Sequence, residues 1–132
     1  MHIITDQNGM PLGFKNTPAN AVEWRQVRYM LRDISGVIPT FRKVLQADKG
    51  YDCEQLRLQL SYKFRMGSRI SKRKHNKDQS GGKPVGRYVV ERTIGYLQRG
   101  FRRLEMCWER TLGMRNALTR FAFMMIYMKK LI

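Results

Sequence analysis

The order in which two kinds of apolar pattern follow one another limits the folds open to this chain. Short apolar segments typical of strands lie at residues 3–5, 11–14, 42–47 and 64–70. Longer segments with helical spacing follow the second, third and fourth of them. The succession is β-β-α-β-α-β-α-α, and strands that alternate with helices pair into sheets covered by those helices. We therefore predict an α/β fold, a mixed sheet flanked by helices.

Local signals predict where several elements begin and end. Asn8-Gly9 separates the first two strands, and both residues tolerate positive φ, which favours a hairpin. Asn20 and Glu23 have the spacing of a capping box, which predicts a helix that ends near residues 35–36. Asp52 is expected to cap the next helix, whose buried face carries Leu56 and Leu60.

Two further helices are predicted in the last third of the chain. The first has one apolar stripe, which consists of Val90, Ile94, Leu97, Phe101 and Leu104. The second runs from about residue 112 to residue 131, and the residues expected to face inward are Leu118, Phe121, Ala122, Met125 and Met128.

The chain is strongly and unevenly basic. Its 26 Lys and Arg against 10 Asp and Glu give a formal charge of +16. Residues 1–50 carry 7 basic and 4 acidic side chains, so residues 51–132 carry the other 19 and 6. Such a charge attracts polyanions, and we expect nucleic acid as the partner, bound mainly by the second part.

A membrane location is not expected. The longest apolar segment, residues 121–128, is far shorter than the roughly 18 residues that a spanning helix needs. Residues 1–4 lead into a polar turn without a secretory signal. We expect a cytoplasmic protein.

Two carboxylates stand where chemistry is plausible. Asp48 directly follows a strand, at the end of the sheet where open α/β folds bind ligands. Glu91 lies beside the apolar stripe of its helix, one turn after Arg87. From the residues alone, a turn or capping role for Asp48 and a surface ion pair between Arg87 and Glu91 are favoured over a catalytic role.

Two motifs favour a catalytic role for these carboxylates. The segment Ala47-Asp48-Lys49-Gly50-Tyr51-Asp52 and the segment Arg87-Tyr88-Val89-Val90-Glu91-Arg92 occur in this order with a basic loop, about residues 71–86, between them. They resemble the segments around the second and third catalytic carboxylates of bacterial insertion-sequence DDE transposases, of the type of insertion sequence families four and five. The resemblance covers almost the whole chain.

The resemblance implies an RNase-H-like fold, association with the bacterial nucleoid, and Mg²⁺-dependent cleavage and transfer of DNA strands. Asp48 and Glu91 would be metal-binding catalytic residues, and Arg87 would contact phosphate. Small, hard Mg²⁺ prefers such clustered oxygen ligands. Nothing before His2 matches the strand that carries the family's first Asp. Residues 1–132 are therefore expected to be a truncated catalytic domain that lacks its first strand and is inactive alone.

Many cations accompany these carboxylates. The expected DNA-binding set is Arg69, Lys72, Arg73, Lys74, Lys77, Arg87, Arg92, Arg99, Arg102 and Arg103, with Lys63 and Arg65 in the same basic segment. We expect salt-sensitive contacts with the DNA backbone that do not depend on base sequence. The alternative is a solvated basic surface.

Three functions remain open. The first is a transposase fragment. The second is a non-catalytic remnant that binds DNA or pairs with full-length transposase and inhibits it. The third is a small RNA-binding protein, which ranks last because neither an aromatic pair on a sheet nor a glycine loop for single strands is present.

Overall fold

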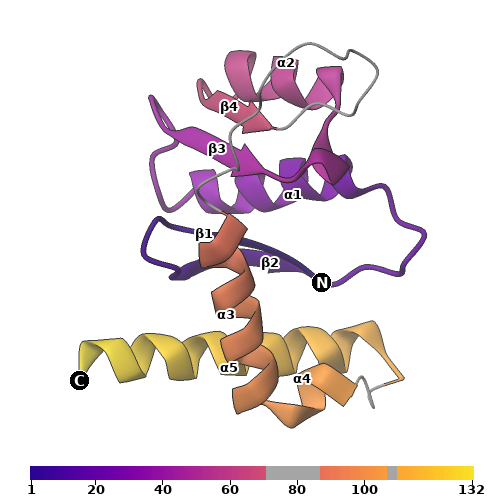
Figure 1. The fold of residues 1–132 in the computed structure, drawn as a ribbon, viewed down its shortest axis with the longest axis vertical. Coiled ribbons are helices and arrows are strands. Elements are labelled where there is room, and N and C mark those ends of the chain that lie inside the picture. The colour runs from indigo at the N-terminus through magenta and orange to yellow at the C-terminus, as the bar shows by residue number, and fades with distance from the viewer. Residues whose placement is uncertain (71–86, 107–109) are drawn as a thin grey trace. The chain divides into compact units, whose positions relative to one another are not determined.

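The computed structural model describes residues 1–70, 87–106 and 110–132 (Figure 1). Strands and helices follow one another in the predicted order, so the α/β class is confirmed. A one-turn helix, η1, and a short helix, α4, were not predicted. The elements are β1 (His2–Thr5), β2 (Pro11–Lys15), α1 (Glu23–Ser35), β3 (Val44–Ala47), η1 (Lys49–Tyr51), α2 (Glu54–Tyr62), β4 (Gly67–Ile70), α3 (Arg87–Gly100), α4 (Arg102–Met106) and α5 (Leu112–Leu131).

The chain forms two compact units, and one of them is discontinuous in sequence. The first unit joins Met1–Asn20 to Val89–Ile132, and the second unit is the continuous segment Ala21–Tyr88. Each unit has its own pair of strands. We describe the units separately.

Both strand pairings expected of a mixed sheet are present, but in two separate sheets. In the first unit β1 and β2 pair antiparallel, with His2 opposite Lys15 and a register shift between Ile4 and Thr5. In the second unit β3 and β4 pair parallel, with Val44 opposite Gly67. Parallel strands need a long connection, which α2 provides. A single mixed sheet is not formed by the residues that the structure describes.

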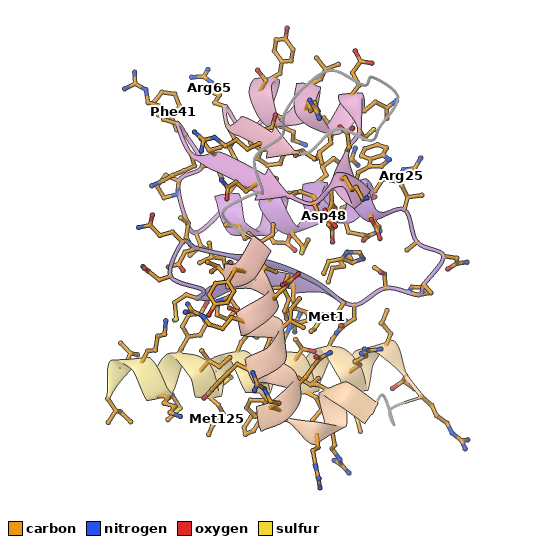
Figure 2. All side chains as sticks on the ribbon, in the orientation of Figure 1. Met1, Arg25, Phe41, Asp48, Arg65 and Met125 are labelled. Atoms are coloured by element: carbon orange, nitrogen blue, oxygen red, sulfur yellow. The ribbon has the colours of Figure 1, made fainter. Side chains whose placement is uncertain are left out.

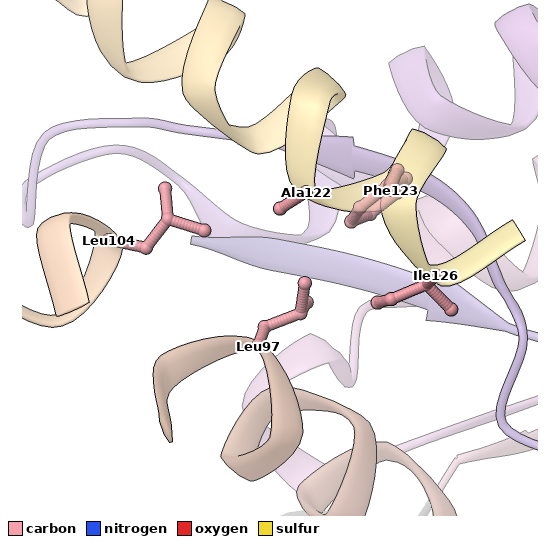
Figure 3. Packing of buried hydrophobic residues seen from close by; sticks show 5 residues of the cluster. All are labelled: Leu97, Leu104, Ala122, Phe123 and Ile126. Carbon is pink, nitrogen blue, oxygen red and sulfur yellow. The ribbon is translucent and has the colours of Figure 1, made fainter. Parts of the chain in front are cut away.

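Helices α3, α4 and α5 bury the hydrophobic core of the first unit against the hairpin. Leu97, Leu104, Ala122, Phe123 and Ile126 form this core (Figure 3), and Ile3 and Phe14 of the hairpin pack against it. The rings of Phe14 and Phe123 meet edge to face, with centroids 5.2 Å apart. Leu97 and Leu104 belong to the predicted stripe. The other three residues of the stripe are only partly buried.

Polar contacts over long sequence distances fix the hairpin in the first unit. The Tyr127 hydroxyl donates to the Pro11 carbonyl. The Asn16 side-chain amide donates to the side-chain Oδ1 of Asn116 at 3.0 Å and to the Thr119 hydroxyl at 3.2 Å. Asn16 and Thr119 are buried, so these hydrogen bonds replace ones that water would otherwise make.

The second unit buries one face of each helix. The face of α1 carries Val27, Met30, Leu31 and Ile34, as its apolar spacing predicts, and Leu56 and Leu60 of α2 are fully buried. Helix α1 contacts α2 and η1, and α2 contacts β4. This packing sets the position of the segment between β3 and α2, which contains Asp48.

Three local predictions were wrong. Helix α1 begins at Glu23, so Val22 and not Asn20 takes the cap position, and it makes no side-chain cap. Helix α2 begins at Glu54 after Cys53, because the Asp52 carboxylate is held by Arg57 instead. In α5 the buried residues are Thr119, Ala122, Phe123 and Ile126. Three residues expected to face inward are exposed there, namely Phe121, Met125 and Met128.

Candidate functional site

Asp48 is the exposed residue that follows the carboxyl end of β3 (Figure 2). Its backbone is extended, and its Oδ1 accepts a hydrogen bond of 2.8 Å from the Lys49 amide. It therefore caps η1, as the structural interpretation expected. A metal-binding role also requires Asp48 at the end of a strand. Capping and ligand binding are therefore compatible for this carboxylate.

A second carboxylate near this segment was not expected from the sequence. An added Cβ on Gly50 would lie 2.5 Å from Glu23 Oε2, so the first residue of α1 reaches the η1 turn. Burial, and then the charges of Glu23 and Asp48, raise the pKa of Tyr51 above its ordinary value of 10.0. Glu23 was interpreted as a capping residue, and nothing in the local sequence indicates its approach to Gly50.

An ion pair holds the chain just after η1. Arg57 of α2 contacts Asp52 at 2.5 Å, and its guanidinium also donates to the Ile70 carbonyl at the end of β4, at 3.1 Å. Both partners of the ion pair are largely buried, with side chains 29% and 18% exposed. This arginine therefore connects the segment after Asp48 to the carboxyl end of the neighbouring strand.

Glu91 is exposed on α3, next to residues that attach this helix to the hairpin of the first unit. The Thr93 hydroxyl is 2.8 Å from the Gly9 carbonyl, and Arg92 donates to the Asn8 carbonyl at 3.3 Å. The position of Glu91 relative to the hairpin turn is therefore set by direct contacts.

The hairpin turn is itself organised by Asp6. Its Oδ1 accepts from the amides of Asn8, at 2.9 Å, and Met10, at 2.8 Å. This is the role of an aspartate that builds a turn.

Asp48 belongs to the second unit and Glu91 to the first. Their approach to one another stays a prediction. Within residues 1–70, 87–106 and 110–132, no group of three or more His, Cys, Asp or Glu side chains is placed so that it could hold a metal ion.

The predicted DNA-binding cations are distributed over both units. Arg69 is exposed on β4 of the second unit. The first unit carries the exposed residues Arg92, Arg99, Arg102 and Arg103 on α3 and α4. Arg87 is the first residue of α3. Four predicted cations lie outside the described residues: Lys72, Arg73, Lys74 and Lys77.

None of the helices that the structure describes is long and apolar enough to cross a bilayer.

Comparison with known proteins adds independent information. The family model of the transposase DDE domain matches residues 1–128. A Burkholderia cepacia protein assigned as a transposase for insertion sequence element IS402 is 34% identical over 129 residues, which cover 90% of this chain and 57% of that protein. The chain thus spans little more than half the length of this relative. No solved structure matches this chain.

Proposed function

Since the chain belongs to the insertion-sequence DDE transposases, we propose that it contributes two metal-binding carboxylates, Asp48 and Glu91, to DNA strand cleavage and transfer. The observation that carries the proposal is the position of Asp48, exposed at the carboxyl end of a strand, inside the 128 residues that match the family. The matched region also includes Glu91.

The proposed fold is the RNase-H-like one. Two of its ingredients support the proposal: an antiparallel hairpin, β1 and β2, and a parallel pair, β3 and β4, joined by a helix. Asp48 follows the carboxyl end of β3, and the carboxyl ends of parallel strands are the common location of ligands in open α/β sheets.

The donor atoms of the site suit Mg²⁺. Asp48 and Glu91 are exposed carboxylates, and Mg²⁺ takes oxygen ligands while keeping several of its waters. Bound there, Mg²⁺ would neutralise charge on the scissile phosphate and lower the pKa of an attacking water or 3′-hydroxyl. We therefore propose Asp48 and Glu91 as its protein ligands.

The remaining proposed roles fall to cations. Arg87, one helical turn before Glu91, would contact a phosphate near the carboxylates. The exposed arginines of α3 and α4 and the basic residues 72–77 would bind the DNA backbone through charge and fix its position without reading bases. Arg92 has in addition the structural role of holding the hairpin turn.

Metal binding at Asp48 can be tested separately from catalysis. Tb³⁺ takes oxygen ligands, and a nearby phenol sensitises its luminescence. The Tyr51 amide donates to the Asp48 carbonyl at 3.0 Å, so Tyr51 is suitably close to act as the donor. We expect Tb³⁺ emission that Mg²⁺ suppresses by competition, and loss of most of that emission in Asp48→Asn.

The matched control is Asp33→Asn, which removes another exposed aspartate of the second unit, on α1. It should leave the emission unchanged. Equal emission from wild type and Asp48→Asn, or an equal loss in Asp33→Asn, would show that Asp48 does not bind the metal.

A double-mutant cycle tests whether Asp48 and Glu91 share one ion. The measured quantity is Mn²⁺ affinity of the wild type, Asp48→Asn, Glu91→Gln and the double variant. Ligands of one ion should be coupled by more than about 0.5 kcal/mol, whereas distant groups add independently within that margin. Additive losses would contradict a shared site.

We also propose that these 132 residues alone do not cleave or join DNA, because they match only two of the family's three carboxylates. Loss of one member of a catalytic group costs several orders of magnitude in rate. Cleavage with Mg²⁺ or Mn²⁺ by the 132 residues that Asp48→Asn abolishes would refute this. DNA binding without metal binding would favour the alternative, a basic module that binds DNA or inhibits full-length transposase.

A further inference from the structure

Two loops of the second unit meet at the amino ends of β3 and β4, opposite the end of β3 that Asp48 follows. Residues 39–43 lead into β3 and residues 63–66 lead into β4. Together they line a shallow, open depression of about 410 Å³, formed by Pro39, Thr40, Phe41, Lys63, Phe64 and Arg65. Figure 2 labels Phe41 and Arg65 at this end of the strands.

The two loops are fixed to each other by hydrogen bonds. The Thr40 hydroxyl donates to the Phe64 carbonyl at 3.0 Å, and the Arg42 amide donates to the Arg65 carbonyl at 3.2 Å. The Gly67 amide then donates to the Lys43 carbonyl at 2.9 Å, just before the strand ladder begins. The depression therefore has a rigid floor.

Arg42 and Arg65, which face each other in these loops, both have a left-handed backbone. Their φ angles are 58° and 50°, and they are the non-glycine residues with positive φ in the described part of the chain. Side chains larger than glycine, asparagine or aspartate rarely adopt this conformation, and such strained positions cluster at binding sites. Asparagine or glycine would adopt this backbone conformation at a lower energy, so arginine is locally unfavourable at both positions.

The charge around the depression has one sign. Arg42, Lys43, Lys63 and Arg65 are all exposed. No Asp or Glu occurs in residues 34–47 or 55–77, the two stretches of sequence from which the loops come. A phosphate at this place meets cations without an acidic neighbour in either loop.

An aromatic ring is exposed among these cations. Phe41 is 54% exposed although its side chain is entirely apolar, and the Arg42 guanidinium lies 5.1 Å from its ring centroid. Phe64 is buried beneath, with Lys63 Nζ 5.9 Å from its centroid. An exposed ring with a guanidinium over one of its faces suits a nucleobase, which would stack on the opposite face while the cations hold its phosphates.

We infer that this depression, the Phe41 loop site, binds an unpaired nucleotide of single-stranded DNA: the base stacks on Phe41 and the flanking phosphates bind Arg42, Lys43, Lys63 and Arg65. A paired base presents no free face to the ring, whereas a single strand does. The site contains neither Asp48 nor Glu91 and uses other residues than the basic ones at 72–77, so the inference does not depend on the proposed catalytic role.

Fluorescence anisotropy with a labelled oligothymidylate and with a blunt duplex tests the proposal on the 132-residue chain. Phe41→Ala should weaken single-strand binding about tenfold and leave duplex binding unchanged. Phe41→Tyr, which keeps a ring, should bind the single strand like the wild type. The matched control is Phe121→Ala on α5, because Phe121 has nearly the same exposed fraction, 55%.

The cations are tested with substitutions that preserve the backbone. Asparagine tolerates positive φ, so Arg42→Asn with Arg65→Asn removes two charges without adding strain. The log–log salt slope of single-strand binding should become smaller in magnitude by about 1.4, since each phosphate contact contributes about 0.7. Circular dichroism melting of each variant checks that it folds.

Several outcomes would overturn the inference. They are no single-strand binding by the wild type, unchanged binding by Phe41→Ala, an equal loss on both DNA forms, or the same loss in Phe121→Ala. Failure of duplex binding alone would count against the proposed DNA-binding role of residues 72–77 and not against the Phe41 loop site. Conversely, duplex binding that survives Phe41→Ala leaves the proposed function intact whatever the single strand does.

Discussion

Replacing Gly9 by alanine perturbs the contact that positions Glu91 in the first unit. Gly9 lies in the hairpin turn with φ +83°, and its carbonyl accepts from the Thr93 hydroxyl of α3. A Cβ on residue 9 would lie 3.0 Å from Thr93 Oγ1 and 3.4 Å from Val89 Cγ1. Thr93 is buried, so its hydroxyl has little space to move away.

The expected loss of stability has two parts. A left-handed backbone costs a residue with a Cβ roughly 1–2 kcal/mol. Displacing the Thr93 hydroxyl loses a hydrogen bond whose net contribution is about 1 kcal/mol. The free energy of unfolding of the first unit should therefore fall by about 2–3 kcal/mol.

Urea unfolding measures the loss, and hydrogen exchange of the hairpin amides assigns it to the first unit. The control is Gly113→Ala: no atom lies within 4 Å of its added Cβ, and α5 should gain about 0.5–1 kcal/mol. In a Thr93→Ala background the cost of Gly9→Ala should shrink to the backbone part, about 1–2 kcal/mol. A loss below about 0.5 kcal/mol in the wild-type background, within the scatter of ordinary surface substitutions, would refute the reasoning.

Three further predictions concern other contacts. Arg57→Ala should lower the free energy of unfolding of the second unit by about 1–2 kcal/mol, measured by urea unfolding, because it leaves Asp52 and the Ile70 carbonyl without this partner. Burial, and then Asp6, raise the pKa of Tyr127, so its contribution to stability is complete below its ordinary value of 10.0 and is lost as pH rises through the higher folded value. Unfolding measured against pH should therefore show a smaller alkaline loss in Tyr127→Phe than in the wild type. Duplex binding should show a log–log salt slope of about −4 to −5 if roughly 5 phosphates are neutralised, and affinity for all sequences should fall alike after substitution of Lys72, Arg73 and Lys74.

The sequence predicted elements whose signals are local. The hairpin forms where Asn8-Gly9 predicts it: Gly9 has the positive φ that the pair permits, and Asp6 completes the turn through hydrogen bonds from the Asn8 and Met10 amides. The helix expected at residues 112–131 has the bounds of α5, since it follows Thr111, whose hydroxyl caps it, and is free of proline. The family itself was also predicted correctly from the two carboxylate motifs.

Prediction from the sequence failed where the position of a residue depends on a partner that is distant in the chain. The inward face of α5 depends on where the Phe14 ring lies, so periodicity selected Phe121 although Phe123 is the residue that packs there. Aspartate commonly caps helices, but the Asp52 carboxylate forms an ion pair with Arg57 instead. The approach of Glu23 to Gly50 joins residues from two elements, and no spacing rule reports it.

The candidate site also contains features that the local sequence predicts and features that it does not. The place of Asp48 at the end of a strand follows from a local pattern and was found. The two left-handed arginines of the Phe41 loop site were not, because arginine carries no turn signal and the strain arises only when the two loops pair. The approach of Asp48 to Glu91 depends on the whole chain and stays a prediction.

The discontinuity of the first unit affects the order in which the chain can fold during synthesis. The second unit is continuous and can fold once residue 88 has left the ribosome. The hairpin must wait, because Asn16 bonds to Asn116, 100 residues later, and Pro11 to Tyr127, 116 residues later. At about 5–20 residues per second this delay lasts roughly 5–20 s. During that interval the nascent hairpin exposes Ile3 and Phe14 without α5, so these apolar side chains are open to a chaperone or to aggregation.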